Sequence, residues 1–261
     1  MKDDDVERFV AEGFVRLPGA FPREVAEECR DALWELMGLS PQDPAGWTQP
    51  VVRIGGSAAE PFQRAADAPA LREAFDRLVG AGRWVPRRGM GTFPIRFPHP
   101  DDPGDAGWHL DASFAGEDGS WRINLRSRGR ALLMLFLFSD VGPDDAPTRI
   151  KVGSHLDVPP FLAPAGEAGR EFFELCGELE KAGRLDAPDR ETALAIGEAG
   201  DVFLCHPFLI HAAQPHRGRE PRFLAQPPLE PVAPLDLERQ DGAFSPVERA
   251  VLRGLAGDAG R

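Results

Sequence analysis

The run ALLMLFLF, residues 131–138, is the feature of the sequence that most constrains the fold. It is far too short to cross a membrane as a helix. Turn-forming residues follow it from Asp140 to Pro147, and a short apolar run that ends in such a loop is typical of a fully buried strand. We therefore expect a central strand in the interior of a β structure.

Several shorter strand-like runs precede and follow this strand. Clusters of proline, glycine and aspartate separate them, a spacing that indicates a sandwich or a barrel. The runs are TFPIRF (92–97), RINLRS (122–127), TRIKV (148–152) and the segments 193–214 and 222–229. Together with the central strand, they predict a mainly β core over about residues 84–230.

Two amphipathic helices are predicted before this core. The first covers residues 22–38, between Pro22 and Gly38, and the second covers about 67–80, where Asp67 is expected to cap the first turn. Apolar residues at helical spacing give each helix one buried face. These residues are Val25, Cys29, Leu33 and Leu36 in the first helix, and Leu71, Ala74, Phe75 and Leu78 in the second.

Helices are also predicted within and after the core. Residues 161–192 interrupt the strands with a mostly helical insertion, a candidate lid, and a last helix covers about 245–256. Ser245 and Glu248 can form a capping box around Pro246 at its start. In the insertion, the residues expected to face inward are Phe172, Phe173, Cys176 and Leu179.

The expected architecture is therefore mainly β with flanking helices. A helical N-terminal flank over about residues 1–83 precedes the core, and the 261 residues are predicted to form a single domain. The three cysteines are odd in number, widely spaced and without a CxxC pair, which predicts reduced core residues and no disulfide framework or zinc ribbon. They are Cys29, Cys176 and Cys205.

The charge of the chain bears on its partners. A formal net charge of −12 without a dense Lys/Arg cluster speaks against nucleic-acid binding. The N-terminus MKDDDVERF lacks the cationic and apolar regions of a signal peptide. We therefore expect a cytoplasmic protein with a small-molecule substrate and no nucleic-acid or membrane partner.

The tripeptide His-Leu-Asp occurs twice, at residues 109–111 and 155–157. In an extended strand, residues i and i+2 point to the same face, so either copy could present an imidazole and a carboxylate to one metal ion. A facial triad of two histidines and one carboxylate on Fe(II) needs a third ligand from a distant strand. The downstream candidates are His206, His211 and His216. The tripeptide alone does not choose between the two copies.

An ordered set of motifs makes this choice. Four features follow one another along the chain: WHLD at 108–111, the long apolar strand with its turn, GDVFLCHPFLIH at 200–211, and then Arg222. Over roughly residues 90–230 the sequence resembles the phytanoyl-CoA dioxygenase family of Fe(II)/2-oxoglutarate oxygenases. The resemblance implies a double-stranded β-helix core, the jelly-roll of cupin-like proteins.

The resemblance also implies an Fe(II) site made of His109, Asp111 and His211. In this family the metal-binding His-x-Asp precedes the long apolar strand, whereas a Gly-Ser-His turn after that strand serves the fold. His155 is accordingly expected to bond nearby backbone. Arg222 is expected to bind the far carboxylate of the cosubstrate 2-oxoglutarate in bidentate geometry, and dioxygen to take the last open position on iron.

Other residues near the motifs are candidates for binding. Arg96 is either a second anchor of the cosubstrate or a solvated cation on a strand, and Thr148 is a candidate hydrogen-bonding partner of the cosubstrate. His206 is expected either to be structural or to support a metal ligand, and His99 and His216 are expected to be exposed. The residues that could face the substrate are Trp108, Phe114, Arg122, Asn124 and Arg126. For these five, a core position of the aromatic rings and a solvent-facing position of the arginines stay open.

The function that the resemblance implies is the oxidation of a small metabolite, with natural-product biosynthesis as the expected context. Hydroxylation is the default outcome, while 2-oxoglutarate becomes succinate and CO2. Desaturation, epimerisation or ring formation share the same first hydrogen abstraction. Two alternatives stay open: a cupin-type metalloenzyme such as an isomerase, which would have no need for Arg222, and a non-catalytic binding module, which would be expected to have lost a ligand.

Overall fold

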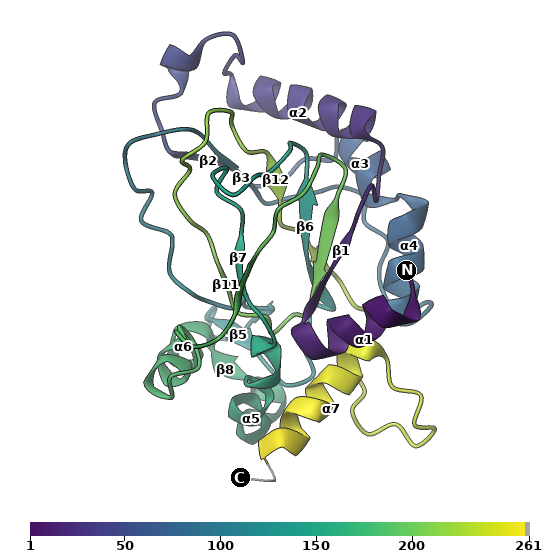
Figure 1. Ribbon diagram of the computed structural model, residues 1–261. Helices are drawn as coiled ribbons and strands as arrows, with labels where there is room; N and C mark the ends of the chain where they lie inside the picture. The colour runs from purple at the N-terminus through teal and green to yellow at the C-terminus, as the bar shows by residue number, and fades with distance from the viewer. Residues whose placement is uncertain (259–261) are drawn as a thin grey trace.

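The largest sheet of the protein is built around the apolar run. The computed structural model describes residues 1–258. The sheet has five strands, and its pairings are antiparallel. Its strands are, in spatial order, β1 (Phe14–Leu17), β10 (Val202–Cys205), β6 (Leu132–Leu137) and β12 (Leu224–Ala225), with β13 (Pro228–Leu229) also paired to β6. The run therefore forms the central strand, which confirms the prediction (Figure 1).

The two faces of β6 belong to two separate apolar cores. Successive side chains of a strand point to opposite faces. Leu133, Leu135 and Leu137 point into a small core that they share with β10. Met134 and Phe136 point into a larger core beneath the helices. Because both faces are covered, every residue of β6 is buried and every one is apolar.

A second sheet closes the small core from the other side. Its order is β11 (His211–Ala212), β7 (Arg149–Lys151) and β9 (Thr192–Leu194), and its pairings are again antiparallel. Ile150 of β7 packs in the small core with Leu135 and Phe203 of the large sheet. The fold is thus mainly β, with two antiparallel sheets on either side of an apolar layer.

Smaller sheets and several isolated bridges extend this arrangement, and two of these bridges join pairs of arginines or histidines. β2 (Val51–Ile54) pairs with β3 (Phe93–Arg96), and β5 (Trp121–Ile123) lies between β4 (Phe114–Ala115) and β8 (Arg170–Glu171). One bridge joins Arg96, at the end of β3, to Arg222 before β12. The other joins His109 to His211 in β11.

Helices cover the large sheet on the face away from β7 and β11 (Figure 1). They are α2 (Arg23–Met37), α3 (Glu60–Ala66) and α4 (Pro69–Leu78). In the large core, the ring of Phe62 lies 6.0 Å from that of Phe138, at the end of β6. The two predicted helices are confirmed as α2 and α4, and the buried residues of α4 are the four that were predicted.

The N-terminal flank differs from the prediction in three ways. Leu36 is 52% exposed, because the buried stripe of α2 runs through Cys29 and Leu33 and leaves Leu36 on the solvent side of the last turn. Asp67 ends α3 instead of capping α4, and its carboxylate accepts hydrogen bonds from Arg72. The flank is also not purely helical, since it contributes β1 and β2 to two sheets.

The segment 161–192 is only partly helical. It begins within α5 (Pro159–Leu162) and contains a 3-10 helix (Ala163–Ala168), β8 and α6 (Phe172–Lys181). Leu175 and Leu179 are buried, four residues apart on one face of α6. Phe173 is 76% exposed because it lies on the opposite face, so its predicted inward orientation is wrong. The residues that pack against the core while partly exposed are Phe172 and Cys176.

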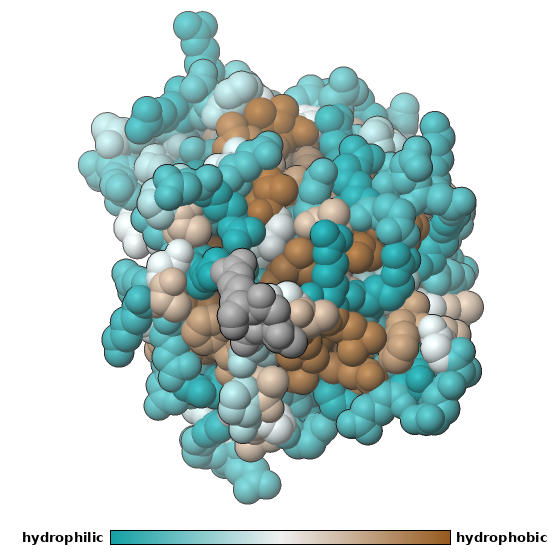
Figure 2. Space-filling view, turned by 60° about the horizontal axis from the view of Figure 1, so that its bottom comes forward, coloured by the Kyte–Doolittle hydropathy of each residue, from teal (hydrophilic) through white to brown (hydrophobic). Residues whose placement is uncertain are grey.

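The last helix, α7 (Pro246–Asp258), begins with the predicted capping box. Glu248 N donates to Ser245 Oγ at 3.3 Å, and a carboxylate oxygen of Glu248 accepts from Ser245 N at 2.8 Å. The same carboxylate pairs with Arg83 and accepts from Asp236 N at 2.8 Å. α7 packs against α1 (Asp3–Glu12) and α5. Figure 2 brings this end of the molecule forward: hydrophilic residues cover most of it, and apolar side chains show between them in its middle.

Two buried histidines lie beneath α1 and α7. The rings of His155 and His206 are 4.9 Å apart. Nε2 of His155 donates to Val10 O at 3.2 Å, and Nε2 of His206 donates to Val247 O at 3.3 Å. Both therefore serve the fold, although the carbonyl that His155 contacts is far away in the sequence and not nearby as predicted. Burial lowers the pKa of His155 to about 3 and that of His206 well below its ordinary value.

The cysteines and the helix lengths bear on two other predictions. All three cysteines are free thiols, with Cys29 and Cys205 buried and Cys176 partly buried, as expected for reduced core residues. Within residues 1–258, no helix is both long and apolar enough to cross a membrane. The cytoplasmic location stays a prediction.

Replacing His206 with glutamine should reduce the loss of stability in acid. In the folded protein the two buried imidazoles stay neutral, whereas in the unfolded chain each takes up a proton below about pH 6.5. The free energy of unfolding therefore falls as the pH drops from about 6.5 towards 3, by up to about 1.4 kcal/mol per pH unit for each histidine. Urea unfolding measures the free energy of unfolding at each pH from about 7 to 5. Its dependence on pH should be weaker in the variant, by the equivalent of about one proton taken up on unfolding. An equal dependence on pH in both proteins would mean that His206 takes up its proton within the fold.

Candidate functional site

His109 and His211 lie directly opposite each other on neighbouring backbone segments. His109 N donates to His211 O at 3.0 Å, and His211 N donates to His109 O at 2.8 Å. Opposed residues in an antiparallel pair point to the same face. The two imidazole centroids are accordingly only 4.5 Å apart, although the residues are distant in the sequence.

Asp111 completes this group, two residues after His109. One potential ligand atom from each of the three side chains lies within 4.8 Å of the others. Among residues 1–258, this is the one group of three or more His, Cys, Asp or Glu side chains with the spacing of a metal site. Two imidazoles and one carboxylate on one face are the donor set of a non-haem Fe(II) centre with open positions. The side chains present therefore fit Fe(II).

Backbone carbonyls determine which nitrogen of each imidazole is available. Nδ1 of His109 donates to Gly107 O at 2.9 Å, and Nδ1 of His211 donates to Leu209 O at 3.0 Å. Nε2 of each ring then carries the lone pair that a metal needs. Burial lowers the pKa of His211 to about 4, although the negative charge of Asp111 acts to raise it. The ring is therefore neutral at neutral pH and free to act as a ligand.

Arg130, directly before the apolar run, supports the carboxylate of Asp111. Its Nη1 lies 3.1 Å from Asp111 Oδ2, and its Nη2 donates to Ala112 O at 3.1 Å. Burial raises the pKa of Asp111, but Arg130 and the two imidazoles outweigh this and lower it. Arg130 was not among the predicted residues. Its position just before a buried strand is the only signal of it in the sequence.

A cavity of about 210 Å³ opens beside the two histidines. Arg222 reaches it from the segment before β12, opposite Arg96, and the two residues exchange backbone hydrogen bonds of 2.8 and 3.0 Å. Three of the predicted residues, Arg96, Thr148 and Arg222, thus come together in one cavity next to the metal ligands. The other residues that line it are Arg53, Pro94, Asp105, Ala213 and Gln226.

The guanidinium of Arg222 is buried with incomplete hydrogen bonding. Nη1 donates to Ala146 O and Nη2 donates to Pro94 O at 3.1 Å, while Nε has no partner. Burial and, second, the charge of Arg96 lower the pKa of Arg222 to about 9, so the side chain is still a cation at neutral pH. A buried cation whose hydrogen bonds go only to carbonyls, and which has another arginine beside it, favours the binding of an anion.

Arg96 is buried as well, and its anionic contact is Asp105. Nη2 of Arg96 donates to Asp105 Oδ2 at 2.6 Å, and Arg53 bonds the same oxygen. Nε and Nη1 of Arg96 have no hydrogen-bond partner. Three arginines against one aspartate leave the cavity positively charged, which fits a carboxylate of a small dicarboxylate such as 2-oxoglutarate. Arg53 and Asp105 were not predicted, because only the folded chain brings their segments together.

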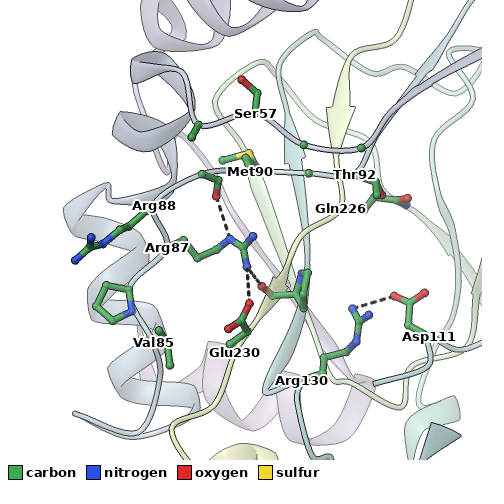
Figure 3. Close-up of a pocket in the computed structure, with 17 residues that line it drawn as sticks. Ser57, Val85, Arg87, Arg88, Met90, Thr92, Asp111, Arg130, Gln226 and Glu230 are labelled. Atoms are coloured by element: carbon green, nitrogen blue, oxygen red, sulfur yellow. Dashed lines mark hydrogen bonds and ion pairs between the residues drawn. The ribbon is translucent and has the colours of Figure 1, made fainter. Parts of the chain in front are cut away.

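A larger cavity of about 860 Å³ lies beside Asp111 (Figure 3). Its walls come from residues 55–58, 85–92 and 226–230. Asp111 and Arg130 line it, whereas the two histidines line the smaller cavity. Gln226 lines both. The three candidate metal ligands therefore stand where the two cavities meet.

The five residues predicted to face the substrate line neither of these cavities. Trp108 contacts the cations of Arg149 and Lys151, which lie 4.6 and 4.4 Å from its ring centroid. Asn124 is buried, and its Nδ2 donates to Glu167 O at 3.2 Å. Both side chains are thus engaged within the fold.

The other three candidates lie near the small sheet of β4, β5 and β8. Phe114 and Arg122 line a separate cavity of about 610 Å³. Nε of Arg126 donates to Leu235 O at 2.7 Å, and this side chain is 45% exposed. Contact of any of the five with substrate stays a prediction.

The remaining histidines and the second His-Leu-Asp copy lie away from the triad. Asp157 pairs with Arg190 and lies 3.7 Å from Arg184, so this copy is engaged in ion pairs. His99 is partly buried, and His216 is buried, so the predicted exposure is wrong for both. The reason at His216 is that the loop after β11 folds back onto another turn. There Arg217 N and Gly218 N both donate to Asp144 O at 2.8 Å.

Comparisons with known proteins agree with this geometry. The sequence profile of the phytanoyl-CoA dioxygenase (PhyH) family matches residues 9–224. No curated protein matches the chain. HygX from Streptomyces hygroscopicus, solved with nickel and 2-oxoglutarate bound, is similar at 18% identity and a TM-score of 0.58, over 94% of this chain and 96% of that one. The non-haem α-ketoglutarate-dependent epimerase SnoN from nogalamycin biosynthesis is similar at 17% identity and a TM-score of 0.55, over 86% of this chain and 80% of that one.

A third solved structure is the hypothetical protein JW0805 from Escherichia coli, with 15% identity, a TM-score of 0.61, and coverage of 89% of this chain and 69% of that one. At such identities the structural likeness shows the fold. The profile match spans most of the chain and shows the family. The chain belongs to the phytanoyl-CoA dioxygenase family of non-haem iron enzymes, which use Fe(II), 2-oxoglutarate and dioxygen.

Proposed function

We propose that this protein is a dioxygenase that hydroxylates a small-molecule metabolite and converts 2-oxoglutarate to succinate and CO2. The observation that carries the proposal is the position of the triad: His109 and His211 line the smaller cavity, Asp111 lies beside them, and the buried cation Arg222 in that cavity has its Nε donor unpaired. A metalloenzyme that does not use 2-oxoglutarate would have no need for this arginine.

In this proposal, His109, Asp111 and His211 bind Fe(II) and leave its other positions open. Arg222 binds the far carboxylate of 2-oxoglutarate, and Arg96 and Thr148 line the same pocket. When bound, Fe(II) and 2-oxoglutarate activate dioxygen for the oxidation of a C–H bond. The side chains of this protein orient the reactants, and burial of the cosubstrate cavity strengthens the pairing of carboxylate and guanidinium.

We also infer that one double-stranded β-helix domain carries the site. Support comes from the two antiparallel sheets that face each other across the small core, and from the ligands at the edge of the second sheet. The N-terminal flank, the insertion and α7 belong to the same domain in this proposal. The large core, to which α2, α4 and α7 all contribute, supports it.

The relatives support a small-molecule substrate of the natural-product type. SnoN is an epimerase and SnoK a carbocyclase, both from nogalamycin biosynthesis, and HygX has been solved with hygromycin B bound. Hydroxylation is the simplest outcome for the present enzyme, because epimerisation, ring formation and desaturation need further control of the same substrate radical.

Asp111→Ala should abolish Fe(II)-dependent turnover of 2-oxoglutarate and weaken metal binding by more than about 100-fold. Loss of a residue that only supports a ligand costs about 10- to 100-fold in metal affinity or activity, and loss of the ligand itself should cost more. Anaerobic calorimetric titration with Fe(II) measures the affinity, and succinate release measures the turnover.

Asp157→Ala is the matched control, because it alters the second His-Leu-Asp copy. It should keep the metal and lower the thermal stability, since Asp157 pairs with Arg190 and lies near Arg184. Loss of metal in Asp157→Ala, with normal binding in Asp111→Ala, would reverse the assignment of the two copies.

Arg222→Ala should weaken 2-oxoglutarate binding by about tenfold or more while the metal stays bound. Each charged hydrogen bond to a carboxylate in a poorly hydrated pocket contributes about 1.5–3 kcal/mol. Arg222→Lys should restore only part of the affinity, because an ammonium group cannot form two parallel bonds. The measurement is anaerobic titration of the Fe(II) protein with 2-oxoglutarate, followed by metal-to-ligand charge-transfer absorption.

Arg219→Ala serves as its control, because Arg219 is an exposed residue of the loop before Arg222. It should leave the affinity unchanged. If folded Arg222→Ala bound 2-oxoglutarate as tightly as the wild type, Arg222 would not be the anchor. If the wild type bound no 2-oxoglutarate, the dioxygenase proposal would fail.

A further inference from the structure

We propose that the larger cavity binds the primary substrate and that Arg130 holds an oxyanion group of it, a carboxylate or a phosphate. The inference rests on the proposed function, because it takes the metal and 2-oxoglutarate to be bound beside this cavity. It adds the substrate class: a small molecule that carries polar groups, one of them anionic.

The position of the larger cavity suits the substrate. In the proposed function 2-oxoglutarate fills the smaller cavity, between the histidines and Arg222, so the substrate has to approach the metal from another side. The larger cavity opens on Asp111 and meets the smaller one at Gln226. Its volume of about 860 Å³ lies within the usual range for small-molecule sites.

Arg130 is an anchor with unmet hydrogen-bonding capacity. Figure 3 shows its guanidinium beside the carboxylate of Asp111 in the wall of the cavity. The side chain is only 13% exposed, and its Nη2 is held by Ala112 O. Nε is buried and has no hydrogen-bond partner, and Nη1 forms an ion pair with Asp111 Oδ2 at 3.1 Å but no well-aligned hydrogen bond. An unmet buried donor costs about 1–3 kcal/mol, and the oxygens of a bound anion can satisfy it.

The charges in the cavity also favour an anion. Nearby groups satisfy Arg87: the carbonyls of Gly89 and Pro228 accept its hydrogen bonds, and Glu230 lies 4.0 Å away. Arg130, in contrast, depends on Asp111, whose single negative charge it must share with a divalent metal once that is bound. Once the metal draws on the charge of Asp111, the ion pair of Arg130 with this carboxylate is weakened, and an anionic group of the substrate can take its place.

The rest of the lining mixes apolar and polar residues and suits a ligand that carries polar groups. Among residues 1–258, no aromatic ring lines the larger cavity. A flat aromatic ligand would find nothing to stack on, whereas the polar groups of a hydrophilic one would meet hydroxyl, amide and peptide groups. The small or polar residues in question are Gly55, Gly56, Ser57, Gly91, Thr92 and Gln226.

The test uses two simple oxyanions, methylphosphonate and acetate, as probes. The full-length protein is loaded with Mn(II) in place of Fe(II) and saturated with 2-oxoglutarate, so that the smaller cavity is filled. Mn(II) is paramagnetic, so an anion that binds beside it shows accelerated phosphorus or carbon nuclear relaxation. The wild type should bind at least one probe in a saturable way. Binding of the phosphonate alone would identify a phosphate group and binding of acetate a carboxylate, and either supports the proposal.

Three variants make the test specific to Arg130. Arg130→Gln should weaken probe binding by about tenfold or more, which corresponds to the loss of one charged hydrogen bond. Arg130→Lys should keep part of the affinity, because it preserves the positive charge beside Asp111. Arg128→Gln is the matched control and should bind as the wild type does, since Arg128 is exposed and lines neither the larger nor the smaller cavity.

Two results would overturn the proposal. One is a wild type that binds Mn(II) and 2-oxoglutarate but neither probe. The other is equal probe binding in wild type and Arg130→Gln, which would mean that the anion binds the metal itself. If Arg130→Gln does not load Mn(II), the comparison rests on Arg130→Lys. This variant should bind the probe measurably more weakly than the wild type does. A wild type that binds neither Mn(II) nor 2-oxoglutarate would refute the proposed function, and this inference with it.

Discussion

Two backbone pairings hold the candidate site together. One joins His109 to His211 and the other joins Arg96 to Arg222, each through two N–H···O bonds of 2.8 to 3.0 Å. Because opposed residues point to the same face, these pairings align the metal ligands and the arginines through the backbone. A slip of one residue in either pairing would turn its side chains to the opposite face. The site therefore depends on the register of the sheets.

The Gly-Ser-His turn after β7 helps to hold that register. Ser154 Oγ accepts a hydrogen bond from Ile210 N at 2.9 Å, directly before His211. Lys151 N donates to Ile210 O at 3.0 Å, and His155 anchors the turn to α1 through the carbonyl of Val10. The second His-Leu-Asp copy thus contributes to the site indirectly, because its turn positions the strand that carries one of the candidate metal ligands.

The sequence predicts those features that leave a local pattern. The central strand, the capping box at Ser245 and the flanking helices each depend on residues close together in the chain. Arg130 and Asp105 leave no such pattern, because long or charged side chains reach the site across gaps that only the tertiary fold closes. The exposure of Phe173 and the burial of His216 were also mispredicted, since both depend on which face a neighbouring segment covers and not on the residues themselves.

The distribution of charge links the fold to its ligands. The chain carries a net charge of −12, yet the interior beside the triad holds arginines with unmet donors, namely Arg96, Arg130 and Arg222. Burying a cation without a full set of partners lowers stability, and a bound anion that supplies those partners restores it. A ligand that binds only the folded state stabilises it, and the stabilisation grows with the concentration of the ligand. The overall acidity of the protein is therefore no guide to its ligands, because the cations that would recognise them are buried where the two cavities meet.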